Sequence, residues 1–177
     1  GLMLGFVLQI AFAAPTIAAE VIGGAMGMSM AQTTDPGTGG TTTAFGQYFI
    51  IVLTLIFLAT GAHLHWIALV TESYRAFPPG ETWLGPERFE AIAMFGGALF
   101  ETALRIALPV TLILLLVQIV TGILSRSAPS LNLFALGLPA GVLAGIAALI
   151  IAAPLIYDQF TDLVEVGLAQ AESVVTP

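Results

Sequence analysis

The sequence predicts an all-α integral membrane protein built from about four long helices. Of its 177 residues, 58% are apolar and 8% are charged, and the mean hydropathy is +1.00. A soluble globular domain carries about 25% charged residues. The few charges here are also spaced so that long stretches carry none. Polar side chains therefore cannot cover a core of this size, which leaves an integral membrane protein or a subunit of a large apolar assembly.

The charge-free stretches place the helices. About 20 apolar residues span the hydrocarbon layer of a bilayer, and on this basis we expect helices over residues 1–31, 46–71, 91–125 and 133–157. Since Gly1 already lies in an apolar run, we expect the chain to begin inside a helix whose start precedes it. An acidic tail after Tyr157 is expected to form an amphipathic helix, with one face carrying Asp158, Asp162, Glu165 and Glu172.

Composition excludes several classes of function. The net charge is −7, there is no lysine, and only four arginines are present, so the phosphates of a nucleic acid would be repelled. The absence of cysteine removes disulfides, thiolate chemistry and cysteine-ligated zinc. We expect no nucleic-acid partner, no cofactor and no metal site.

The segment between the first two predicted helices is unusual in composition. Met26, Met28 and Met30 precede a glycine- and threonine-rich loop over residues 32–45, in which Asp35 is the only charged residue and Asp35-Pro36, near its start, is a turn signal. The loop is either an exposed connector or irregular backbone that lines an interior cavity, where membranes tolerate it. Methionine is deformable, and an apolar constriction that stops water and ions would need that property.

Glycines at four-residue spacing predict close helix contacts. Gly23 and Gly27 form one such pair, and Gly137, Gly141 and Gly145 form a longer run. Packing within the chain is the simpler interpretation for a single pair, whereas the triple run favours a seam between subunits.

Two acidic residues lie inside apolar helices. Glu101 and Arg105 stand at i and i+4 and are expected to neutralise each other. Glu20 has no charged residue three or four positions away, so we expect it to face another subunit or water.

Enzymatic and metal sites are weakly supported. Gly27-Met28-Ser29-Met30 resembles only part of an intramembrane serine-protease motif, with His63 or His65 as a possible base. On a helix those two histidines point about 200° apart, so they cannot share a metal ion. Beside Trp66 they are typical of a membrane interface. We therefore expect no catalytic residues and no enzyme.

Three sets of motifs together resemble the flagellar biosynthetic protein FliR family. They comprise the run Ala19–Ala31 with Asp35-Pro36, the stretch Gly61–Leu64, and a C-terminal series over 104–109, 124–129, 131–134 and 137–139. The resemblance implies an export-gate subunit of the flagellar type III secretion system. Residues 1–90 would form a FliP-like part, and residues 91–177 a FliQ-like helical hairpin with the acidic tail.

The resemblance also implies a place and a role for the site residues. FliP, FliQ and FlhB- or FlhA-type export proteins are the expected partners, with unfolded flagellar proteins as cargo, membrane lipid around the gate, and the inner membrane and flagellar basal body as location. Residues 27–43 would plug the pore, with Met26, Met28, Met30, Thr33, Asp35 and Pro36 as plug or gasket. Glu20 and the glycines would lie at subunit interfaces. The hairpin loop with Arg126, Pro129 and Asn132 would face the cytoplasm.

Other functions stay open at this point. The homologous subunit of a virulence injectisome would share the fold and mechanism but serve other partners. A secondary transporter would show inverted repeats and a charged midplane site, and the sequence contains neither. A membrane enzyme with Ser29 as nucleophile is the remaining alternative.

Overall fold

A computed structural model describes residues 2–28, 33–34, 41–42, 44–77, 86–127 and 133–175. Five helices occur among these residues. Their bounds are α1 Leu2–Ala25, α2 Ala44–Ala59, α3 Ala62–Ala76, α4 Pro86–Ser127 and α5 Leu133–Val175. Two short strands, β1 (Thr33–Thr34) and β2 (Thr41–Thr42), pair antiparallel between α1 and α2. Apart from this ladder the described chain is all-α, as the sequence predicts.

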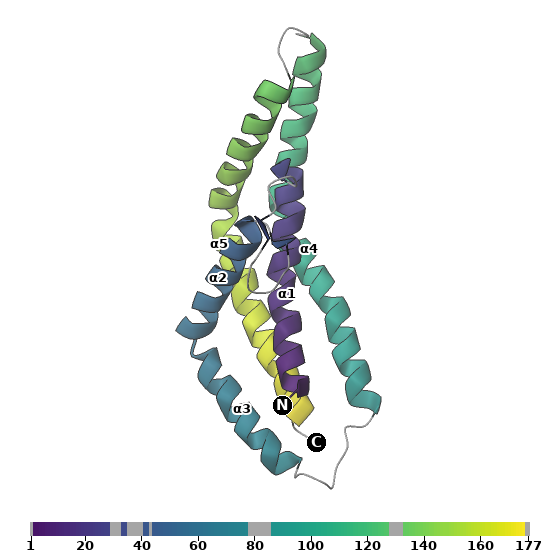
Figure 1. The fold of residues 1–177 in the computed structure, drawn as a ribbon, viewed down its shortest axis with the longest axis vertical. Helices are drawn as coiled ribbons and strands as arrows, with labels where there is room; N and C mark the ends of the chain where they lie inside the picture. Colours follow the sequence, from purple (N-terminus) through teal and green to yellow (C-terminus); the bar gives the residue numbers. More distant parts are fainter. Residues whose placement is uncertain are drawn as a thin grey trace.

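The two longest helices, α4 and α5, form an antiparallel hairpin that runs along most of the molecule (Figure 1). α1 packs along its lower part, and α2 and α3 follow α5 on the other side. Both ends of the chain lie near the bottom of the view. The tip of the hairpin extends well beyond the end of α1, so no other helix of the described residues lies beside the upper part of α4 and α5.

The predicted single helix over 46–71 is wrong, because α2 and α3 are separate helices that meet at an angle of 74°. Gly61 adopts a left-handed conformation with φ of 73°, which glycine accepts at little cost. The Thr60 hydroxyl also donates to the Ile56 carbonyl at 2.9 Å. A charge count does not detect such a break, because neither Thr60 nor Gly61 is charged.

The predicted tail after Tyr157 is a continuation of α5, which runs without a break to Val175. Its expected amphipathic character is confirmed. Asp158, Asp162, Glu165 and Glu172 are exposed, whereas the opposite face buries Phe160, Leu163, Val164 and Ala171. The apolar face of the tail thus belongs to the core of the molecule.

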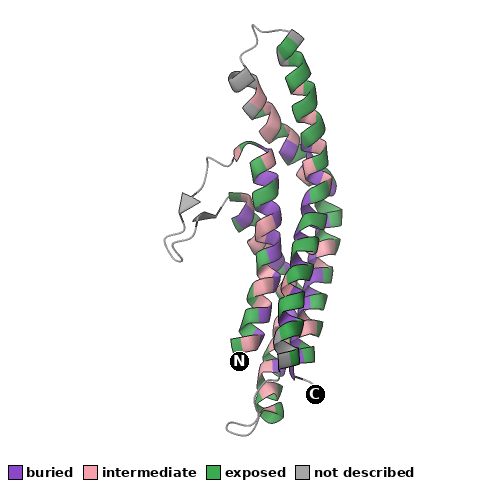
Figure 2. Cartoon of the chain, turned by 90° about the vertical axis from the view of Figure 1, so that its right-hand side faces the viewer, coloured by how far each residue is buried: buried purple, intermediate pink, exposed green. Residues whose placement is uncertain are grey.

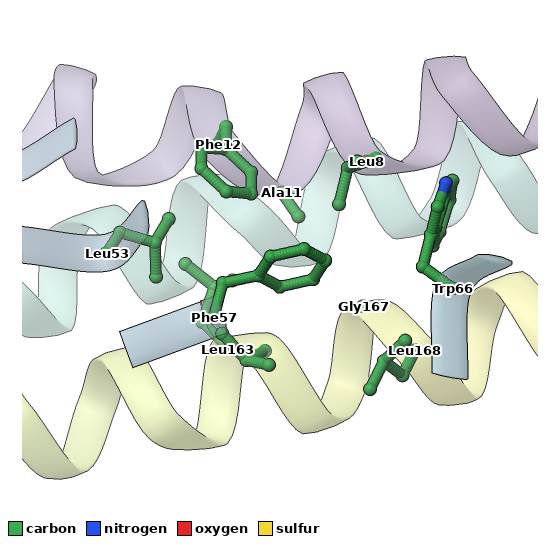
Figure 3. A pocket seen from close by; sticks show the side chains of 10 residues that line it. Leu8, Ala11, Phe12, Leu53, Phe57, Trp66, Leu163, Gly167 and Leu168 are labelled. Carbon is green, nitrogen blue, oxygen red and sulfur yellow. The ribbon is translucent and has the colours of Figure 1, made fainter. Parts of the chain in front are cut away.

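The core follows the lower two thirds of the hairpin, where α1 lies against it (Figure 2). Small residues on α1 allow close approach: a Cβ on Gly167 of α5 would lie 3.4 Å from the Ala11 Cβ. Four helices meet around a small apolar pocket of about 10 Å³ (Figure 3). Phe12 of α1 and Phe57 of α2 pack edge to face there, with ring centroids 5.9 Å apart.

Within the described part of the chain, three helices are long and apolar enough to cross a membrane, and the bent α2–α3 pair would make a fourth span. Large apolar side chains are exposed along all of them, notably on α4 from Met94 to Leu124 and on α5 from Leu143 to Val166. This pattern agrees with an all-α membrane protein.

Candidate functional site at the end of α1

α1 ends in a tight turn directly before the methionine- and threonine-rich segment. The Met26 N–H donates to the Ile22 carbonyl at 2.9 Å and the Gly27 N–H donates to the Gly24 carbonyl at 3.0 Å. Gly27 has φ of 80°, the left-handed conformation with which glycine commonly ends a helix. The predicted helix over 1–31 therefore stops at Ala25, and Gly27 redirects the chain away from the helix axis.

Met26 is buried, with 2% of its surface exposed, and it lies over two of the three glycines that the sequence singled out on α5. A Cβ on Gly141 would lie 3.3 Å from the Met26 carbonyl oxygen, and a Cβ on Gly145 would lie 2.6 Å from the Met26 Cγ. Gly137, one turn earlier, would meet nothing within 4 Å. Gly141 and Gly145 thus admit the end of α1 within this chain.

A glutamine of α4 completes this contact. The Gln118 side-chain amide donates to the Ala25 carbonyl at 2.8 Å, so it satisfies one of the carbonyls that the end of a helix leaves unpaired. The sequence reasoning missed this residue. A single amide within the charge-free stretch 106–125 was the available signal.

The other predicted plug residues are placed only in part. Met28 is half-buried and packs against the core. Thr33 lies in β1, where it pairs with Thr42 of β2. Met30, Asp35, Pro36 and the proposed nucleophile Ser29 lie outside the described residues.

The predicted interface and hairpin residues are spread along the molecule. Glu20 is exposed on α1, and no ion pair involves it among the described residues. Gly23 is buried and Gly27 exposed. Arg126 is exposed near the tip of the hairpin, while Pro129 and Asn132 lie outside the described part of the chain. These calls stay predictions.

Glu101 and Arg105 form the predicted ion pair, 2.6 Å apart with both side chains about two thirds exposed. Arg105 lines a groove of about 270 Å³ between α4 and α5, which Asp162 and Glu165 also line. An exposed pair of this kind contributes about 0–1 kcal/mol. It offsets two charges on an apolar helix and does not provide a reactive group.

No group of three metal-ligating side chains occurs within the described ranges. His63 has a buried Nδ1 without a hydrogen-bond partner among the described atoms, whereas His65 is exposed. The two side chains therefore differ in environment, although they are separated by one residue only.

An apolar groove of about 660 Å³ separates the start of α2 from the middle of α5. Ala44 and Phe45 line it from α2, and Ile146 and Leu149 line it from α5. At its lower end Phe49 packs edge to face on Phe160, with centroids 5.5 Å apart. The residues that follow the threonine-rich segment thus lie over α5, as do those that precede it.

Comparison with known proteins gives consistent matches. The family described as Bacterial export proteins, family 1, matches residues 1–166. The chain is 34% identical over 156 residues to the flagellar biosynthetic protein FliR of Escherichia coli (strain K12), which covers 88% of this chain and 60% of that protein. It is 31% identical over 160 residues to the FliR of Bacillus subtilis (strain 168), covering 89% and 62%. The chain thus spans about 60% of the length of these relatives.

Proposed function

The chain belongs to the family of bacterial export proteins, family 1, and from this premise we propose that it is a component of the flagellar protein export apparatus. The curated relatives described above carry the name flagellar biosynthetic protein FliR. That name favours a flagellar system over a virulence injectisome. The long apolar helices support a location in a membrane, and in this proposal it is the bacterial inner membrane at the flagellar basal body.

In this proposal the chain forms a gated pore together with FliP and FliQ, next to FlhB- and FlhA-type export proteins, and passes unfolded flagellar proteins. No bond is made or broken by this subunit. The observation that carries the proposal is the segment 29–43, in which Asp35 is the only charged residue. It is flanked by packed residues: Met26 lies against Gly141 and Gly145 of α5, and Ala44 and Phe45 line the groove on α5. A secretion gate has to let an unfolded chain pass without leaking ions. A short, deformable plug of mostly apolar and uncharged polar residues suits this need better than a rigid filter.

Deletion of residues 32–42 tests the plug. We expect the assembled gate to leak ions after the deletion, because the segment no longer reaches across the pore. Conductance is measured in a planar bilayer or in loaded vesicles. A matched control shortens residues 78–85, between α3 and α4 in the sequence, and should leave the conductance unchanged. Equal conductance with and without residues 32–42 would refute the plug.

Co-purification tests the partners. We expect the tagged full-length protein to retain FliP- and FliQ-like proteins. We also expect Glu20→Ala to weaken this retention, since an exposed carboxylate on an apolar helix is more stable against a partner or water than against hydrocarbon. Glu72→Ala, which alters an exposed carboxylate on α3, is the control. Equal retention by the two variants would remove Glu20 from the proposed interface.

A further inference from the structure

The end of α1 contacts both arms of the α4–α5 hairpin at one level. From α4, Gln118 donates to the Ala25 carbonyl at 2.8 Å. From α5, Gly141 and Gly145 leave the space that the Met26 carbonyl and side chain occupy. We call Gln118, Gly141 and Gly145 the α1 socket. The socket combines Gln118 of α4 with Gly141 and Gly145 of α5. It therefore forms only when these two helices keep their present spacing.

The chemistry of the socket is specific. The end of a helix leaves its last carbonyls without an intrahelical donor, and the Gln118 amide of α4 supplies a donor to the Ala25 carbonyl. A side chain at position 145 would collide with the Met26 side chain, whereas one at position 141 would press on the Met26 backbone. Gly137 lies on the same helix and has open space, so the requirement for glycine is local.

The start of α2, which follows residue 43, lies over the same stretch of α5. Ala44 and Phe45 line the apolar groove together with Ile146 and Leu149, directly after Gly145 on α5. Met26 and the first residues of α2 therefore both lie against α5 between Gly141 and Leu149. A change in the position of this stretch would move Met26 and the start of α2 together.

We propose that Gln118, Gly141 and Gly145 are positioning residues that hold Met26, and through it Met28, against the hairpin, so that the spacing of α4 and α5 sets where the chain leaves α1. Met26 acts in this arrangement as the anchor. The seal itself then falls to Met28 and the residues that follow. The functional meaning of this anchor rests on the proposed plug, but its structural part does not.

The structural part is tested with spin labels, for which the absence of native cysteine is convenient. One label replaces Met28, directly after the anchor, and the other replaces Leu155, which is exposed on α5. In the full chain in detergent we expect one narrow distance distribution, and Gly145→Leu should abolish it. Gly137→Leu is the matched control and should preserve it. A second label pair, at Phe6 and Leu155, should stay unchanged in all variants if only the anchor is lost.

Rescue separates the anchor from a general loss of structure. Met26→Ala combined with Gly145→Leu should restore the narrow distribution, because the leucine replaces the missing methionine side chain. The same Met26→Ala should not rescue Gly141→Leu, because that leucine meets the Met26 backbone. Gln118→Met keeps the length of the side chain but removes the donor, and it should broaden the distribution. The proposal is overturned if Gly145→Leu leaves the distribution narrow, or if Gly137→Leu broadens it equally.

Ion leakage of the assembled gate then tests the functional meaning. Gly145→Leu should raise leakage, and Gly97→Leu on α4, which also has open space around it, should not. If the labels show loss of the anchor while leakage stays at the level of the unmodified gate, the anchor stands and the plug assignment fails. If leakage rises while the distribution stays narrow, the anchor fails and the plug stands.

Discussion

Replacement of Phe160 by alanine should destabilise the molecule, because this side chain joins the middle of α5 to α2. Phe160 is fully buried, and Phe49 of α2 is 2% exposed. Their rings pack edge to face with centroids 5.5 Å apart. Loss of the Phe160 ring leaves a cavity at the lower end of the groove between the two helices and removes the aromatic contact.

The expected loss is about 2–3 kcal/mol. In soluble proteins Phe→Ala in a core costs about 3–5 kcal/mol, part of which is transfer from water and part the cavity. The transfer part is small in a micelle, because the side chain stays in apolar surroundings when the helices separate. The cavity and an aromatic pair worth about 0.5–1.5 kcal/mol remain. Phe100→Ala, which removes a ring that is 66% exposed on α4, should change the free energy by less than about 0.5 kcal/mol.

The measurement is unfolding of the full chain in mixed micelles by a denaturing detergent, followed by circular dichroism. A double-mutant cycle with Phe49→Ala isolates the ring contact and should give a coupling of about 0.5–1.5 kcal/mol. Equal losses for Phe160→Ala and Phe100→Ala, or strictly additive losses for Phe49 and Phe160, would refute the packing described here.

Three further predictions use the same unfolding measurement. Gly167→Val should lower the free energy of unfolding by about 1–3 kcal/mol, because α1 approaches α5 closely at Ala11. Gly97→Val, with open space around it, should lower it by less than about 1 kcal/mol. Equal losses would contradict the close approach. Gly61→Ala should cost about 1–2 kcal/mol because its φ is 73°, and a neutral result would mean that the break between α2 and α3 does not need a left-handed residue. Arg105→Gln should cost no more than about 1 kcal/mol, since both partners of its ion pair are largely exposed, and a larger loss would assign the pair a structural role.

The helices were predictable where charge and length decide them, and unpredictable where a local backbone conformation does. The spacing of charges predicts the positions of α1, α4 and the first part of α5 to within a few residues at most ends. It misses the break at Gly61 and the turn at Gly27, which depend on positive φ values in uncharged surroundings. It also ends the last helix at Tyr157, because the length of a membrane span says nothing about an amphipathic continuation.

The residue types of the candidate site could be predicted from the sequence, but their arrangement in space could not. The sequence distinguishes Met26 and the glycines of α5 as separate features. Their contact joins positions more than a hundred residues apart, and only the course of the hairpin brings them together. The role of Gln118 was hidden for the same reason, since its partner is the backbone of another helix and carries no side-chain signal.

The exposed surface of α4 is longer than a bilayer can cover. Large exposed apolar side chains extend from Met94 to Leu124, a distance of about 45 Å along a helix, whereas the hydrocarbon core is about 30 Å thick. At an average tilt of about 20° the stretch still projects about 42 Å along the membrane normal. Some 10 Å of apolar helix would then face water in an isolated chain. Protein subunits can cover such a surface and lipid tails cannot. The shortage of charged residues therefore supports a chain that packs among apolar partners. Purification of the full-length protein without any partner would contradict this reasoning.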